Sequence, residues 1–248
     1  MILTRDYITS NLSEGVITVN LSSWEEFSNL VTGRLLNTSN YIWRGQRSID
    51  WLLESTWDRM LKMSDKKDSL MHLKNSKYVT RDRRELNQEK IESDDEWWAL
   101  EQYYGPATPL LEWTISPFVA AYFAFCEEGN EQDKRAIYSF AQRVVTVKNN
   151  ELKMENPAGT SEDDLLVKCI NVLFDDNSRL ANYSGLFTKS PTGVDIEEWV
   201  RKNFSVVSKA KVVLLKLTLP DTERTTILKA LNRMNINYLT IFPDISGK

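Results

Sequence analysis

Apolar residues recur at helical spacing in several stretches of the chain, and this periodicity predicts a series of amphipathic helices. The first begins after Ser23, which can cap it, and continues through Phe27 and Val31. The helix that Ser116 and Pro117 open is apolar nearly all round, which predicts that it is buried. Further helices are predicted at residues 52–61, 69–98, 162–174, 197–204 and 222–234.

Short runs rich in β-branched and aromatic residues lie between these helices and predict strands. The runs are residues 41–43, 136–147, 185–188, 211–219 and 238–242. Because helices dominate and strands are short, the predicted class is α+β, with several helices around short mixed or antiparallel strands. No linker divides the chain, so residues 1–248 are predicted to form one domain with a helical excursion around residues 62–98.

Composition narrows the function classes. The net charge is −4 and the pI is about 5.3, so the chain lacks the excess of Lys and Arg expected of a general binder of phosphate backbones. The longest apolar run, residues 118–126, has half the length of about 18 residues needed to cross a bilayer. Because the start of the chain also lacks a basic and apolar leader, a cytoplasmic location without a membrane partner is predicted.

Cysteine and histidine usage argues against metal and histidine chemistry. Cys126 and Cys169 lie far apart in apolar-patterned segments and are predicted to be buried thiols, without a Cys-x-x-Cys pair. The single histidine, His72, lies in the charged stretch 66–77 and is predicted to be solvated. A zinc site and a Ser-His-Asp or Cys-His mechanism are therefore disfavoured, and no metal is predicted.

Candidate chemistry begins at Trp43-Arg44-Gly45-Gln46, at the end of a predicted aromatic strand. A strand end would hold the base of the Arg44 side chain rigidly, and Gly45 would leave the backbone open to a ligand. A fixed guanidinium suits bidentate contact with phosphate or carboxylate. The pattern is equally compatible with a structural ion pair between Arg44 and one of the 35 acidic residues.

A second candidate lies in Trp113-Thr114-Ile115-Ser116-Pro117. If this stretch is extended, Thr114 and Ser116 point to the same side and place two hydroxyl groups beside a helix N-terminus, which is a natural site for anions. Plain capping of the following helix by these hydroxyls is the alternative.

Taken in order, these segments resemble the FRG domain, a family named for its aromatic-Arg-Gly motif. The matching motifs are residues 43–46, Trp51 or Trp57, Arg59, residues 102–105, residues 110–117, Ala120, Phe123-Ala124, Arg179, Gly185, Phe187 and residues 241–244. The sequence departs from the family pattern at Tyr103, Glu112 and Tyr183, where histidine, aspartate and glutamine are usual. Glu112 keeps the carboxylate, whereas Tyr103 and Tyr183 leave open whether the chain is catalytically active.

The same residues have a more distant resemblance to ADP-ribosyltransferases of the Arg-Ser-Glu type. An Arg-Gly at a strand end, and a Thr-x-Ser that opens an Ala-x-x-Phe helix, look like the first two motifs of that class. The resemblance implies an ADP-ribosyltransferase-like core in which Arg44 holds the phosphate or ribose of NAD, while Thr114 and Ser116 brace its nicotinamide half. The acids available near matched motifs for the third position are Glu112 and Asp244.

This resemblance assigns roles to a small set of residues, with NAD as the implied substrate. The implied catalytic residues are Arg44, Ser116 and Glu112. The implied cofactor-binding residues are Arg44, Gly45, Gln46, Trp113, Thr114, Ser116 and Tyr104. Trp43, Trp113 and Tyr104 would offer stacking surfaces.

The function implied is that of an NAD-using ADP-ribosyltransferase or NAD glycohydrolase-like protein, in the setting of a bacterial toxin or phage defence. Such chemistry needs a carboxylate to stabilise an oxocarbenium-like centre and needs no histidine or metal. Protein, nucleic acid and water are all open as acceptors. The alternatives are a non-catalytic module that binds a nucleotide or nucleic acid, and a structural interaction domain in which Arg44 is ion-paired inside.

Overall fold

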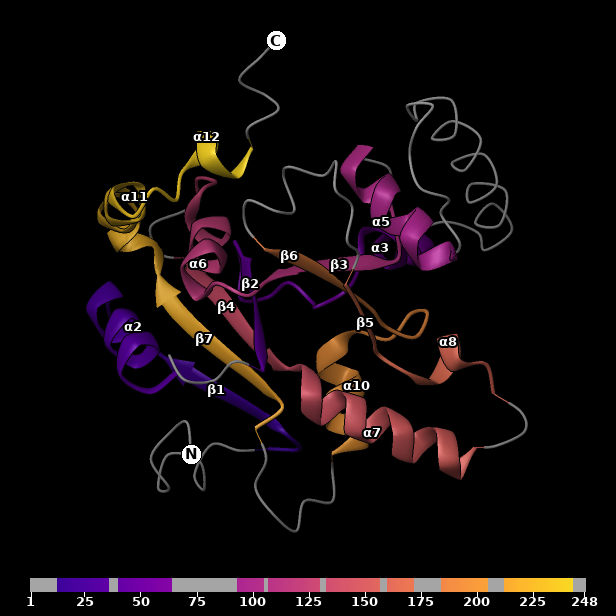
Figure 1. Ribbon diagram of the computed structural model, residues 1–248. Coiled ribbons are helices and arrows are strands. Elements are labelled where there is room, and N and C mark those ends of the chain that lie inside the picture. Colours follow the sequence, from indigo (N-terminus) through magenta and orange to yellow (C-terminus); the bar gives the residue numbers. More distant parts are fainter. Residues whose placement is uncertain are drawn as a thin grey trace.

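The computed structural model describes residues 13–35, 40–63, 93–104, 107–129, 133–156, 160–171, 184–204 and 212–242. Within these ranges one seven-stranded sheet runs through the molecule, in the order β1-β7-β4-β2-β3-β6-β5 (Figure 1). The strands are β1 (Val16–Asn20), β2 (Tyr41–Gln46), β3 (Leu110–Thr114), β4 (Lys134–Ala141), β5 (Lys168–Ile170), β6 (Gly185–Lys189) and β7 (Leu214–Pro220). Among the described strands only β1 and β7 pair in parallel, so the predicted combination of helices with short, mostly antiparallel strands is confirmed.

Helices cover both faces of this sheet. In the described ranges they are α2 (Trp24–Leu30), a π-helical turn (Val31–Leu35), α3 (Thr56–Met63), α5 (Asp94–Tyr104), α6 (Pro117–Phe125), α7 (Gln142–Glu155), α8 (Glu162–Leu165), α10 (Ile196–Asn203), a 3-10 turn (Asp221–Glu223), α11 (Arg224–Arg233) and α12 (Tyr238–Ile241). The core on one face includes Phe27 of α2, Ala120 of α6 and Ile227 of α11 (Figure 1). The core on the other face includes Val145 of α7 and Trp199 of α10. The sheet therefore carries a hydrophobic core on each side.

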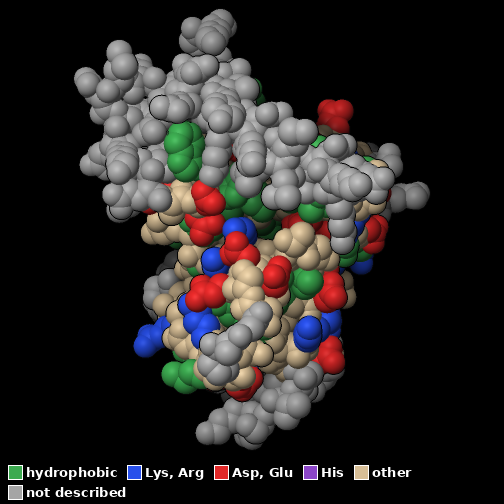
Figure 2. Space-filling view, turned by 90° about the vertical axis from the view of Figure 1, so that its right-hand side faces the viewer, with side chains coloured by type: hydrophobic (Ala, Val, Ile, Leu, Met, Phe, Trp, Pro, Cys, Tyr) green, Lys and Arg blue, Asp and Glu red, His purple; other side chains and the backbone are tan. Residues whose placement is uncertain are grey.

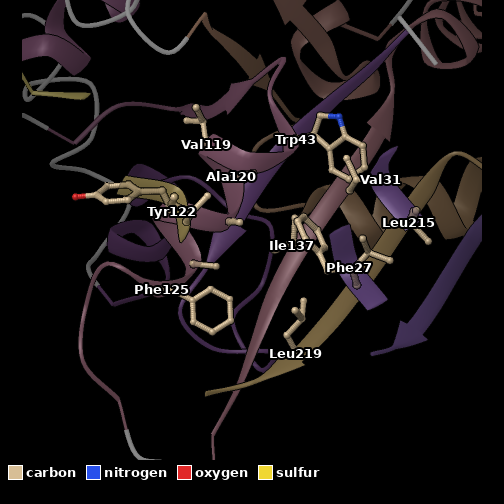
Figure 3. Close-up of a cluster of buried hydrophobic side chains, with 14 of the residues drawn as sticks. Phe27, Val31, Trp43, Val119, Ala120, Tyr122, Phe125, Ile137, Leu215 and Leu219 are labelled. Carbon is tan, nitrogen blue, oxygen red and sulfur yellow. The ribbon is translucent and has the colours of Figure 1, made fainter. Parts of the chain in front are cut away.

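α6 is buried, as its apolar sequence predicts. Ser116 caps it: the Ser116 Oγ accepts a hydrogen bond from the Val119 N–H at 3.3 Å, and Pro117 begins the helix. Figure 3 shows Ala120 of this helix in the same apolar cluster as Trp43 of β2. A Cβ atom at Gly45 would lie 1.8 Å from the Ala120 carbonyl oxygen, so the glycine allows α6 to lie directly on β2.

Two arginines bind the carbonyl groups at the C-terminal end of α6. Arg135 donates to the Ala124 and Glu127 carbonyl oxygens at 3.3 and 3.2 Å, and Arg224 donates to those of Phe125 and Cys126 at 2.8 and 2.9 Å. These carbonyls have no partner within the helix, and a positive charge is favourable at this end of the helix dipole. The turn that follows α6 is therefore fixed in place.

Several predicted elements are confirmed with adjusted limits. The helices predicted to start after Ser23 and Ser116 and those at 197–204 and 222–234 are present, and so are the strands at 41–43, 185–188 and 211–219. β2 continues three residues further than predicted, through Gln46. The helix predicted at 52–61 begins only at Thr56. Most of the helical excursion around 62–98 lies outside the described residues, and the extent of the domain stays a prediction.

Three predicted elements are wrong. The strand predicted at 136–147 ends at Ala141, and α7 begins at the next residue. Val145 of α7 is buried, so the β-branched residues of this stretch belong to an amphipathic helix. The helix predicted at 162–174 stops at Leu165 and is followed by β5, which pairs with β6. Residues 238–241 are helical rather than extended, because Asn237 and Thr240 form a capping box at the start of α12. β1 was not predicted.

Candidate functional site

The candidate site lies where β2 and β3 separate. These strands pair at one position, Trp43 with Thr114, and beyond it β2 continues along β4 while β3 continues along β6 (Figure 1). The opening is a cavity of about 250 Å³, named here the β2–β3 cleft. It is lined by Trp43, Arg44, Gly45, Gln46, Arg47, Trp51, Glu112, Trp113, Thr114, Phe123, Cys126 and Glu127. Most of the residues predicted for the site thus lie together.

Arg44 fills part of the gap between the strands. Its Nη1 donates to the Glu112 carbonyl oxygen at 2.6 Å, so a side chain replaces a main-chain hydrogen bond that the separated strands lack. Its Nε is buried without a hydrogen-bond partner, and no ion pair to Arg44 occurs among the described residues. Burial lowers the pKa of Arg44 to about 10, an effect that the nearby Glu112 carboxylate partly opposes. Arg44 is therefore a cation at neutral pH, poorly solvated and next to a cleft.

Glu112 and Gln46 supply acceptors on the same cleft. Glu112 comes from β3 and faces Arg44 closely enough to influence its charge. The Gln46 Nε2 donates to the Leu52 carbonyl oxygen at 3.2 Å, which ties the end of β2 to the following loop. The Gln46 Oε1 is buried and has no hydrogen-bond partner among the described residues. A guanidinium, a carboxylate and an amide thus come together from β2 and β3.

The two predicted hydroxyls are used by the backbone. Thr114 Oγ1 accepts a hydrogen bond from the Ser116 N–H at 3.1 Å, and the Ser116 Oγ caps α6. Thr114 lines the cleft but is almost fully buried, and Ser116 is not among the cleft residues. Of the two interpretations of this segment, capping is the one that the geometry favours for Ser116.

Two predicted stacking surfaces belong to the cores instead. Trp43 lies beside Val31 in the cluster of Figure 3. Trp113 stacks on Phe140, and its indole N–H donates to Thr188 Oγ1 at 2.8 Å. Both tryptophans are 3% exposed or less, so neither offers a free ring face to a ligand.

Gly45 and Tyr104 were also predicted to bind the ligand. The contact with α6 by itself requires glycine at position 45, because a Cβ atom there would meet the Ala120 carbonyl oxygen, and the approach of a ligand to the Gly45 backbone stays a prediction. Tyr104 is the last residue of α5, and its side chain lies outside the described part of the structure, as do Arg179, Tyr183 and Asp244.

The cleft also contains residues to which no functional role could be assigned from the sequence. Trp51 is 46% exposed, and the Arg47 guanidinium lies over its ring, with Cζ 5.1 Å from the ring centroid. Arg47 pairs with Glu127 at 3.1 Å, joining the loop after β2 to the turn after α6. Only Trp51 had a signal in the sequence, as one of two tryptophans that fit the family motif. Nothing in the local pattern marks Glu127, because α6 alone brings it to the cleft.

Cys126 lies in the cleft as well. Both cysteines are free, and each is partly exposed, which corrects the prediction that they are buried thiols. Burial nevertheless raises the pKa of the Cys126 thiol, which is therefore protonated at neutral pH and a weak nucleophile. Among the described residues, no group of three or more His, Cys, Asp or Glu side chains is arranged to hold a metal ion, and no helix is long and apolar enough to cross a membrane.

Comparison with known protein families finds a match over part of the chain. Residues 39–134 match the family model of the FRG domain, a segment that includes β2, β3 and α6. This segment is therefore similar to the FRG domain, and the residues that line the β2–β3 cleft lie within it. No curated protein and no solved structure matches the chain.

Proposed function

We propose that the β2–β3 cleft binds NAD and that the protein is an ADP-ribosyltransferase or NAD glycohydrolase. The observation that supports this proposal is the state of the Arg44 side chain. Its guanidinium is poorly solvated and charged, makes one hydrogen bond within the described part of the chain, and adjoins a cleft, so N–H donors remain for an anionic ligand. An arginine that served only an internal ion pair would be expected to meet an acid and no cleft.

The size of the cleft limits which part of NAD it encloses. Its volume of about 250 Å³ is below that of typical pockets for drug-sized ligands, which begin at about 300 Å³. We infer that Arg44 binds the pyrophosphate or ribose of the nicotinamide half. The rest of the dinucleotide would extend over Trp51, which is the exposed aromatic ring at the cleft.

Glu112 has the position and chemistry for the reactive role. The bond between the nicotinamide nitrogen and ribose C1′ breaks, and its electron pair leaves with nicotinamide. Positive charge then develops on the ribose, and the Glu112 carboxylate would stabilise it. A nucleophile, either water or an acceptor group, forms the new bond to C1′ and releases its proton. An ADP-ribosyltransferase-like core is part of this proposal.

One observation favours a second candidate, a non-catalytic nucleotide-binding module. Ser116 caps α6 and is not among the cleft residues, so one of the two hydroxyls expected to brace nicotinamide lies elsewhere. Nucleotide suits the surface better than nucleic acid. On the face shown in Figure 2, acidic and basic described side chains are intermixed and form no broad basic area.

Calorimetric titration with NAD, combined with mass-spectrometric detection of nicotinamide, tests both candidates. Arg44→Lys keeps the charge but loses the planar fork, and we expect it to weaken NAD binding at least about tenfold. Glu112→Gln should leave binding within about threefold while slowing nicotinamide release by about 100-fold or more. The matched control is Arg143→Lys, which alters an exposed arginine on α7 and should change neither measurement.

The outcomes separate the candidates. Nicotinamide release that depends on Glu112 supports the enzyme. Binding that depends on Arg44 without any release supports the binding module. If the wild-type protein does not bind NAD at millimolar concentration, the proposal for NAD is wrong.

A further inference from the structure

Gln46, the last residue of β2, has a buried acceptor to which no described residue donates. The residue is 3% exposed and lines the β2–β3 cleft. Its Nε2 donates to the Leu52 carbonyl oxygen at 3.2 Å, whereas its Oε1 has no hydrogen-bond partner in the described part of the chain. A buried amide oxygen without a partner is costly, and a donor from a bound molecule would satisfy it.

The Leu52 carbonyl determines which end of the Gln46 amide is left for a ligand. A carbonyl oxygen can only accept a hydrogen bond, so the amide nitrogen is the atom that faces Leu52. Turning the amide over would bring two oxygen atoms together at that contact. The atom that remains is therefore the acceptor, and a ligand has to offer an N–H or O–H donor to it.

Arg44 provides the opposite kind of group beside this acceptor. Arg44 and Gln46 are two positions apart in β2, so their side chains leave the same face of the strand, with their bases about 7 Å apart. The Arg44 Nε is also buried and has no hydrogen-bond partner among the described residues. The cleft thus has a donor and an acceptor, side by side, that the described fold does not use.

These two atoms define the chemistry of the ligand. The Arg44 cation favours an anionic acceptor, such as a phosphate. A positively charged donor at Gln46 would lie close to this poorly solvated cation, so a neutral donor such as a hydroxyl fits better. A sugar phosphate carries both groups within a few bonds of each other. The cleft volume of about 250 Å³ suits a group of this size rather than a whole dinucleotide.

We propose that the β2–β3 cleft binds a ribosyl phosphate, with its phosphate on Arg44 and a ribose hydroxyl that donates to the Gln46 Oε1. Gln46 is then a specificity-determining residue that selects a ribose over a deoxyribose. The inference rests on the proposed function for the choice of a ribosyl phosphate, because this is the part of NAD assigned to the cleft. It adds the requirement for a hydroxyl and the residue that reads it.

Titration of the full chain with ribose 5-phosphate tests this inference, together with the 2-deoxy and 3-deoxy analogues, which each lack one hydroxyl. We expect saturable binding of ribose 5-phosphate and a loss of about tenfold for one of the analogues. Gln46→Met keeps the length of the side chain and removes the acceptor, so it should bind ribose 5-phosphate and that analogue equally weakly. The matched control is Gln142→Met, the same exchange at the start of α7 and outside the cleft, which should retain the selectivity.

The ratio of affinities for ribose 5-phosphate and its analogues separates recognition from a structural role of Gln46. A variant that only loosens the cleft would bind all three ligands more weakly, whereas loss of the acceptor removes the selectivity. Circular dichroism confirms that each variant is folded. If Gln46→Met does not fold, Gln46→Asn, which retracts the oxygen by one methylene, takes its place.

Three results would overturn the proposal. They are no saturable binding of ribose 5-phosphate at millimolar concentration, equal binding of both analogues by the wild type, and unchanged selectivity in the Gln46 variant. Titration with NAD keeps the two proposals apart. NAD binding that is the same in the wild type and in Gln46→Met supports the proposed function and overturns this inference. Hydroxyl-selective binding of ribose 5-phosphate by a protein that does not bind NAD has the reverse meaning.

Discussion

Arg44 and Arg135 are both arginines largely withdrawn from water, and their hydrogen bonds distinguish their roles. Arg135 is fully buried, and its three nitrogens donate to Asp221 Oδ1 and to the Ala124 and Glu127 carbonyl oxygens. Arg44 makes one hydrogen bond to the residues that the structure describes, and it adjoins the β2–β3 cleft. The first arginine is satisfied by the fold, whereas the second has donors to spare for a ligand.

Loss of Arg135 should therefore destabilise the protein strongly. In the native protein the Arg135 Nε donates to Asp221 Oδ1 at 2.7 Å. Arg135→Ala leaves this buried carboxylate without its partner and removes the hydrogen bonds to the Ala124 and Glu127 carbonyl oxygens at the end of α6. We expect the free energy of unfolding to fall by about 3–5 kcal/mol, measured by urea denaturation. The control is Arg47→Ala, which removes an exposed ion pair with Glu127 and should cost less than about 1 kcal/mol. Equal losses in the two variants would contradict this account of Arg135.

The lowered pKa of Arg44 predicts an unusual pH dependence of ligand binding. The cation is the form that binds an anion, and it is fully populated well below a pKa of about 10. Affinity for ADP-ribose should therefore be constant between about pH 6 and pH 8 and should fall as the pH approaches 10, where an ordinary arginine would remain charged. Calorimetry over this range, with circular dichroism to confirm folding at each pH, makes the measurement. Constant affinity through pH 10 would rule out Arg44 as the titrating group.

Helices with strong local signals could be predicted from the sequence, and those that depend on partners could not. α6 has a capping serine, a proline at its start and an apolar surface all round, so its position follows from residues 116–125 alone. Residues 142–147 are rich in β-branched side chains, yet they form α7 because the sheet ends at Ala141 and Val145 packs beneath it. β-propensity reflects packing against neighbouring strands, which the local sequence does not reveal.

The close packing of α6 on β2 at Gly45 can be tested by mutation. In Gly45→Ala the new methyl group would meet the Ala120 carbonyl oxygen at 1.8 Å, and backbone cannot move aside as a side chain can. We expect a loss of about 3 kcal/mol in the free energy of unfolding, at the upper end of overpacking costs. Gly33→Ala is the matched control, because its Cβ would meet nothing within 4 Å. That variant should be neutral or gain up to about 1 kcal/mol. If Gly45→Ala is tolerated equally well, α6 does not rest on β2 at this point.

The candidate site is a property of the whole sheet. The sequence identified Arg44, Glu112 and Thr114, which the structure brings to one cleft, because they lie in motifs that are continuous in the chain. It could not identify Glu127, whose position depends on α6 and on its contact with Arg47. Nor could it predict the cleft itself. The cleft exists because β2 and β3 turn to different partners, β4 and β6, which follow much later in the sequence.

This dependence predicts that the matched FRG segment does not fold alone. A fragment of residues 39–134 contains β2 and β3 but only the first residue of β4, and it lacks β6 entirely. Ile42 and Trp113, each 2% exposed or less, would lose the strands and helices that cover them. We expect the fragment to show narrow amide dispersion in ¹H–¹⁵N NMR spectra and no cooperative urea transition, whereas the full chain shows both dispersion and cooperativity. A cooperative transition in the fragment would mean that β2, β3 and α6 form a core of their own, and that the later strands are additions to it.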